Sequence, residues 1–180
     1  SDGTKMYTVG QTNDTVYQYS LPTPWVLTGG SYASVSFSVA SQEAAPRGLY
    51  LKPDGTRRYM IGIGTTGAVH QYSLSSPWNV ASMSYDSVSY APAQLGDADD
   101  VSFNPTGTKL YILTNTADTV YQYTLNTPWD IATGAYDSIS FSFASQDITP
   151  TGLFFRPDGT KMYMSGSFGD DIYQYSLGLS

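Results

Sequence analysis

The stretch 152–177 reads GLFFRPDGTKMYMSGSFGDDIYQYSL, three short apolar runs separated by two turn sequences. The first turn is Pro157-Asp158-Gly159, in which proline presets φ and glycine accepts a positive φ, as tight turns require. The second is Gly169-Asp170-Asp171. No segment of the chain offers ten residues of helical periodicity, so the pattern predicts short antiparallel strands joined by turns.

The same pattern returns along the chain at a spacing of 52 residues. The turn tripeptides are Asp2-Gly3-Thr4, Asp54-Gly55-Thr56, Thr106-Gly107-Thr108 and Asp158-Gly159-Thr160. A drift of one residue in the second unit is repaired before Gln94. Such regular self-similarity indicates one supersecondary unit copied in tandem. The expected organisation is a single domain, 1–180, with repeat units 1–52, 53–104, 105–156 and 157–180.

A full unit also contains a fourth strand, seen most clearly in the alternating sequence YDSISFSFA at 136–144. Four antiparallel strands in about 50 residues are typical of a β-propeller blade. The first two strands of each unit are apolar on both faces, which suits a sheet packed between two neighbours. The fold class predicted is therefore all-β, a β-propeller. Its strands would number fourteen, grouped 3, 4, 4 and 3, or about three and a half blades.

The stretch 152–177 resembles repeats of the YVTN and lactonase-like propeller superfamily, in its Pro-Asp-Gly turn and the strand that follows. The longer unit, with TPWD at 127–130 and YDSISFSFASQD at 136–147, is similar to tandem repeats of secreted bacterial and phage-borne proteins. The resemblance covers the whole chain and implies the fold. It implies little about function, because propellers host binding, scaffolding and many chemistries. The chain departs from the pattern at Thr106-Gly107 and at 96–100.

The composition excludes several classes of protein. The chain has 180 residues, a net charge of −7 and only eight Lys and Arg residues, so it lacks the basic face of a nucleic-acid binder. It has no apolar run long enough for a membrane-spanning helix. It has no cysteine, which removes disulfides and thiolate ligands. The richness in Ser, Thr, Tyr and Gly favours an extracellular location, and the similarity to phage-borne repeats implies a virion surface as the other possibility.

Charges separate when they are assigned to the two loop faces of a propeller. One face takes the loops before the first strand and after the second, and it would carry Arg47 and nine carboxylates: Asp14, Glu43, Asp97, Asp99, Asp100, Asp118, Asp147, Asp170 and Asp171. The hairpins on the other face would carry seven cations: Lys5, Lys52, Arg57, Arg58, Lys109, Arg156 and Lys161. Polar loops alone could produce this division, and so could a face that attracts cations or discs that stack by opposite charge.

Two repeated sets of residues are candidates for ligand binding. Each Trp follows a Pro just after the third strand of its unit, at Trp25, Trp78 and Trp129. These rings could pack between blades, or they could form platforms for sugar rings. The glutamines Gln42, Gln94 and Gln146 recur beside the loop that precedes the first strand of the next unit. They could satisfy backbone groups there or contact a ligand.

Asp97, Asp99 and Asp100 form the sharpest local cluster of carboxylates. Oxygen ligands of this kind can bind Ca²⁺, although no Glu closes a 12-residue calcium loop. The alternative is a solvated loop in which Asp100 caps a turn. We expect no obligatory cofactor, with calcium at these three residues as the alternative.

The function predicted from the sequence is a non-enzymatic recognition module that uses its loop faces to bind glycan or protein. Near-identical repeats argue against catalysis, which needs distinct groups, and no nucleophile elbow is present. Because the first unit lacks its first strand and the last lacks its fourth, open strand edges predict a homo-oligomer. The alternatives are a structural unit that completes a ring or forms filaments, a fragment of a longer or engineered propeller without its own activity, and a propeller-type hydrolase or lactonase.

Overall fold

The computed structural model describes residues 2–64 and 67–178 and contains fourteen strands and two short 3₁₀ turns. The strands are β1 (Lys5–Gly10), β2 (Thr15–Ser20), β3 (Ser31–Ser38), β4 (Pro46–Leu51), β5 (Arg57–Gly62), β6 (Val69–Leu74), β7 (Met83–Tyr90), β8 (Ala98–Phe103), β9 (Lys109–Thr114), β10 (Thr119–Leu125), β11 (Gly134–Ser142), β12 (Pro150–Phe155), β13 (Lys161–Gly166) and β14 (Ile172–Ser176). The 3₁₀ turns are η1 (Val80–Ser82) and η2 (Ile131–Thr133). Neither turn is long enough to cross a membrane as a helix, and the described residues contain no other helix.

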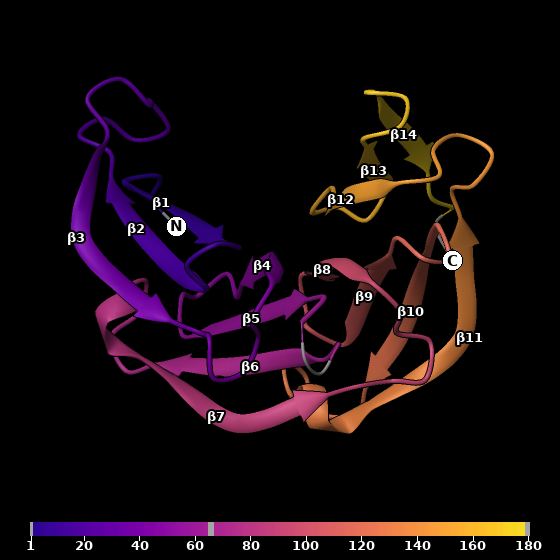
Figure 1. Cartoon of the computed structure of the whole chain (residues 1–180), viewed down its shortest axis with the longest axis horizontal. Coiled ribbons are helices and arrows are strands. Elements are labelled where there is room, and N and C mark those ends of the chain that lie inside the picture. The colour runs from indigo at the N-terminus through magenta and orange to yellow at the C-terminus, as the bar shows by residue number, and fades with distance from the viewer. Residues whose placement is uncertain (1, 65–66, 179–180) are drawn as a thin grey trace.

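The strands form four antiparallel sheets, which we call blades I to IV in chain order. Blade I is β1-β2-β3, blade II is β4-β5-β6-β7, blade III is β8-β9-β10-β11 and blade IV is β12-β13-β14. Figure 1 shows the blades following one another along an arc, with β3, β7 and β11 on its outer edge and β4, β8 and β12 toward its centre. The β-propeller fold predicted from the sequence is confirmed.

The repeated turn sequence shapes the hairpin between the first two strands of a blade. In blade II, Gly55 adopts φ 76°, a left-handed conformation that glycine accepts at no steric cost. The Asp54 carboxylate accepts hydrogen bonds from the Thr56 amide at 3.0 Å and the Thr56 hydroxyl at 2.7 Å. The same two bonds recur between Asp2 and Thr4 and between Asp158 and Thr160. Proline, aspartate and glycine therefore each have a separate role in the turn.

Three apolar cores lie between successive blades. The one between blades I and II includes Val16, Met60 and Tyr72, and the next is centred on Tyr59 and Phe103. A third core joins blades III and IV. Side chains alternate along each strand, so neighbours such as Tyr59 and Met60 enter different cores. This explains why both faces of the early strands are apolar in sequence.

Arg58 is a departure from the charge division expected from the sequence. It was placed among the cations of one loop face, but its side chain is fully buried between blades I and II. The guanidinium lies over the ring of Tyr7, 3.8 Å from the ring centre. Burial lowers the pKa of Arg58 to about 10. The expected basic ring on this face therefore loses one of its seven cations.

Candidate functional site

The innermost strands of three blades line a cavity at the centre of the arc. Strands β4, β8 and β12 lie side by side there (Figure 1). The cavity that they line has a volume of about 370 Å³. The wall is mostly apolar, with Tyr50, Phe103 and Phe155 among its residues, and Asp100 contributes a carboxylate to it. A concave apolar cavity with a few well-placed polar groups is the usual form of a small-molecule site.

Asp100 enters this cavity because its counterparts are glycines. Gly48 and Gly152 occupy the same position of the repeat, 52 residues before and after it. A Cβ added at Gly48 would lie 2.7 Å from the Asp100 Cα and 2.9 Å from its Oδ1. Glycine at 48 therefore leaves the space that one carboxylate fills, which breaks the symmetry of the repeat at the centre of the fold.

The Asp100 carboxylate is fixed by two backbone amides. Its Oδ1 accepts a hydrogen bond from the Val101 amide and its Oδ2 accepts one from the Leu153 amide, both at 2.8 Å. Burial raises the pKa of Asp100 to about 6, with a smaller contribution from the charge of Asp99, while the two amides act in the opposite direction. Each oxygen retains acceptor capacity, so this carboxylate can exchange a proton near neutral pH.

An ion pair lies beside Asp100 on the same inner strands. Arg47 and Asp99 are the extra residues of equivalent bulges in β4 and β8, where the register shifts. The Arg47 guanidinium donates to the Asp99 carboxylate, which is almost fully buried. Burial raises the pKa of Asp99 although Arg47 opposes the shift. Neither residue of this ion pair lines the central cavity, so Asp100 is the acidic side chain that a molecule in the cavity would meet.

The three tryptophans lie at the opposite end of the inner strands from the ion pair of Arg47 and Asp99. Each has a positive φ between 64° and 66°, and its ring covers the turn glycine of its own blade. The Trp78 and Trp129 carbonyls also accept hydrogen bonds from the hydroxyls of Tyr7 and Tyr59 in the preceding blades, both at 2.6 Å. In the structure these residues pack turns and connect blades, while Trp25 remains largely exposed.

The glutamines lie in the loops that follow the outermost strands, so they are not gathered with the tryptophans. The backbone amides of Gln42 and Gln146 donate hydrogen bonds to the backbone carbonyls of Val39 and Phe143, at 2.9 Å and 2.8 Å. The Gln94 side chain accepts a long hydrogen bond of 3.5 Å from the Tyr123 hydroxyl. These contacts give the glutamines local partners, and a ligand at them stays a prediction.

Two carboxylates that the sequence assigned to an open loop face directly follow two of these glutamines and are buried instead. Glu43 and Asp147 are buried and bridge two loops. Glu43 accepts from the Ala45 amide at 2.9 Å and the Gly64 amide at 2.6 Å. Asp147 accepts from the Thr149 amide at 2.7 Å and the Gly169 amide at 2.9 Å. Their 104-residue separation, twice the repeat, was the available signal. Both residues tie loops together and do not enter the central cavity.

The structure engages Asp97, Asp99 and Asp100 separately. Asp99 pairs with Arg47, and Asp100 accepts hydrogen bonds from two backbone amides. The backbone amide of Asp97 donates to the Thr116 hydroxyl at 3.0 Å. Within residues 2–64 and 67–178, no group of three or more His, Cys, Asp or Glu side chains is placed to hold a metal ion. Calcium at these residues therefore receives no support from the geometry, and it stays a prediction.

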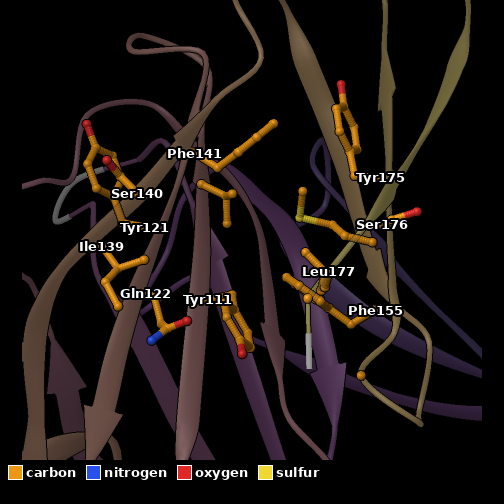
Figure 2. Close-up of a pocket in the computed structure, with 14 residues that line it drawn as sticks. Tyr111, Tyr121, Gln122, Ile139, Ser140, Phe141, Phe155, Tyr175, Ser176 and Leu177 are labelled. Atoms are coloured by element: carbon orange, nitrogen blue, oxygen red, sulfur yellow. The ribbon is translucent and has the colours of Figure 1, made fainter. Parts of the chain in front are cut away.

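A second hollow, about 540 Å³, lies between blades III and IV (Figure 2). Ile139 and Phe141 of β11 face Tyr175 and Leu177 of blade IV across it. Between blades I and II the equivalent space is occupied by η1, which packs against β3. The hollow is thus the position at which the outer part of a blade would pack, and we favour the central cavity as the functional site.

Comparison with known proteins gives a result for the fold only. No family model matches the chain, and no curated protein matches it. Solved structures do match, among them a candidate 6-phosphogluconolactonase from Bacteroides fragilis with a TM-score of 0.67 and 17% identity, covering 98% of this chain and 48% of that one. A similar candidate from Bacteroides uniformis has a TM-score of 0.65 and 15% identity, covering 99% and 52%. The periplasmic gluconolactonase PpgL of Pseudomonas aeruginosa has a TM-score of 0.65 and 14% identity, covering 98% and 48%.

The chain thus spans about half the length of the structures that it matches. The resemblance to lactonase-like propellers is confirmed for the fold. The prediction of a non-enzymatic recognition module is contradicted, because these propellers are named for lactone hydrolysis and not for binding alone. The alternatives of a structural unit and of an inactive fragment gain no support from them. The prediction rested on the near-identity of the repeats and gave too little weight to their departure at 96–100.

Proposed function

We propose that this chain forms the active part of a propeller-type hydrolase that opens sugar lactones. The observation that carries the proposal is Asp100, a half-buried carboxylate with a pKa of about 6 in the central cavity, where the other blades have glycine. The names of the fold neighbours give additional support. At 14–17% identity those names cannot carry the proposal without the site.

In the proposed reaction Asp100 acts as a general base. It removes a proton from water as the water oxygen attacks the lactone carbonyl. The tetrahedral intermediate then breaks the ring C–O bond. The leaving alkoxide takes the proton back from Asp100, so that lactone and water give one hydroxy acid. A pKa near the working pH suits a group that both accepts and returns a proton.

The charges around the site favour an uncharged lactone over a phosphorylated one. The cavity wall carries one carboxylate, Asp100, and one cation, Arg156, which is already paired with Asp158 at 3.0 Å. A phosphate group would be repelled by Asp100 and would have to compete with Asp158 for Arg156. We therefore propose a neutral sugar lactone as the substrate class.

The test is hydrolysis of glucono-δ-lactone, with spontaneous hydrolysis measured in parallel. Asp100→Asn preserves the size of the side chain and removes the base, so kcat should fall by about 100-fold or more. Asp170→Asn is the matched control, since Asp170 is exposed in the loop after β13, does not line the cavity and has a left-handed backbone that asparagine also accepts. Equal rates for wild type and Asp100→Asn, with the fold intact by circular dichroism, would refute the proposed role.

We also propose a location outside the cytoplasm. The proposal is supported by one of the fold neighbours, which is a periplasmic protein. Fractionation of cells that express the natural gene would test this, with a cytoplasmic protein as the outcome against it.

A further inference from the structure

The large apolar side chains that remain exposed gather on the first and last parts of the arc. They are Trp25, Val26, Leu27, Tyr32, Ile139, Phe141, Ile148, Phe154, Phe168 and Ile172. Among the described residues of blade II, none belongs to this set. Exposed apolar area concentrated in this way indicates surfaces that bind a partner.

Ile172 shows what is uncovered on blade IV. The same position holds Val16 in β2, Val69 in β6 and Val120 in β10, which are 0%, 0% and 5% exposed because the next blade packs on them. Ile172, in β14, is 77% exposed. Its side of blade IV is therefore an interface of the repeat without its partner.

Leu27 shows the complementary half on blade I. It lies two residues after Trp25, as Val80 and Ile131 lie two residues after their tryptophans. Val80 and Ile131 are fully buried against the preceding blade, whereas Leu27 is 69% exposed. The side of blade I that carries Leu27 is thus shaped to cover a preceding blade.

The polar contacts of the inner interfaces match these two surfaces as well. The Gln18 side chain accepts from the Val80 amide at 3.0 Å, and Gln71 accepts from the Ile131 amide at 3.3 Å. The counterpart of these glutamines in blade IV is Gln174, which faces the same uncovered side as Ile172.

A second polar contact joins blade I to blade II and blade II to blade III. The hydroxyls of Tyr7 and Tyr59 donate to tryptophan carbonyls of the following blade. The counterpart in blade IV is Tyr163, and the corresponding carbonyl in blade I is that of Trp25. Both halves of this contact are therefore present on one chain.

We propose that the blade IV surface with Tyr163, Ile172 and Gln174 binds the blade I surface with Trp25 and Leu27 of a second copy of this chain. Because every copy carries both surfaces, two copies related by a twofold axis use each surface once and close a ring. The chain matches about half the length of its fold neighbours, so two copies supply the length of one such propeller.

The experiment is the mass in solution of the 180-residue chain, by light scattering on a sizing column over a range of concentrations. The expected mass is twice the 19.5 kDa of one chain. Leu27→Asp and Ile172→Asp place a charge in the two surfaces, and each should raise the dissociation constant about tenfold or more. Ile148→Asp, at an exposed apolar loop residue outside both surfaces, should leave the dimer unchanged.

Mixing the two variants tests the pairing directly. A dimer with one Leu27→Asp copy and one Ile172→Asp copy has one fully intact interface, so the mixture should associate more tightly than either variant alone. The proposal is overturned if the wild type has the mass of one chain, which would leave these surfaces to further blades of a longer polypeptide. It is also overturned by an open polymer, by variants without effect, or by a mixture no tighter than its components.

Discussion

At position 58 an arginine stands where the other blades have Met6, Leu110 and Met162. Its guanidinium is buried, and none of its three nitrogens has a hydrogen-bond partner among the described residues. The face of Tyr7 offers a cation–π contact that offsets part of the desolvation cost. The desolvation cost of a buried charge is usually recovered only when an opposite charge lies nearby. Among the described residues, no carboxylate lies at ion-pair distance from Arg58.

We therefore expect Arg58→Met to raise the free energy of unfolding by about 1 kcal/mol or more, since methionine fills the equivalent position elsewhere. Urea unfolding followed by tryptophan fluorescence measures this. Arg57→Met is the control, because Arg57 donates to the Trp129 carbonyl at 2.7 Å and its loss should not stabilise the protein. A less stable Arg58→Met variant would show that the buried charge contributes to the core.

Asp100 and Arg58 show how far the sequence could be used at this scale. Both are single departures from a repeat, visible at a spacing of 52 residues as an aspartate among glycines and an arginine among apolar residues. The clustering of Asp97, Asp99 and Asp100 along the chain suggested one shared site. A bulge in β8 instead directs Asp99 toward Arg47 and Asp100 toward the amide of Leu153. Sequence distance alone does not reveal such a bulge.

At the scale of elements, the turn between the first two strands of a blade and the tryptophan of the same blade form one unit. Gly107 adopts φ 69° and is covered by the ring of Trp129, whose amide donates to the Gly107 carbonyl at 2.9 Å. Gly159 has nearly the same conformation, φ 72°, but nothing lies within 4 Å of a Cβ added there. Alanine at Gly159 would therefore incur only the cost of backbone strain, whereas alanine at Gly107 would also clash with the tryptophan ring.

Gly159→Ala should lower the free energy of unfolding by about 1 kcal/mol, the cost of a left-handed conformation for alanine. Gly107→Ala should cost about 3 kcal/mol or more, because its methyl group must also displace the indole. Chemical unfolding of both variants measures the difference. Equal losses would show that the tryptophan ring does not pack on the turn.

The strands themselves were predictable because their turns carry strong local signals. The four Gly-Thr turns and the alternating outer strands gave the grouping of 3, 4, 4 and 3 strands found in the four sheets. The tryptophans were harder to interpret, because packing and ligand binding both favour a repeated aromatic. The geometry places the rings over Gly3, Gly55 and Gly107, which accounts for packing, and a ligand at the tryptophans stays a prediction.

For the whole molecule, the decisive property is the contrast between repeated packing and one asymmetric centre. Three similar cores hold the blades together, and they allow the inner strands to differ. At the centre of the arc, that freedom places one carboxylate in an apolar cavity. The sequence shows an aspartate among glycines, but it could not show that this residue lies in a cavity, because the inner strands of different blades meet only in the folded chain.

The measurement that tests this account most directly is the pH dependence of glucono-δ-lactone hydrolysis between pH 5 and 7.5, after subtraction of the rate with Asp100→Asn. A base must be deprotonated to act, and burial raises the pKa of Asp100 to about 6. The rate should therefore be low at pH 5, rise with a midpoint near pH 6 and level off above pH 7. A net rate that is absent, or one that does not change across this range, would contradict a catalytic role for Asp100.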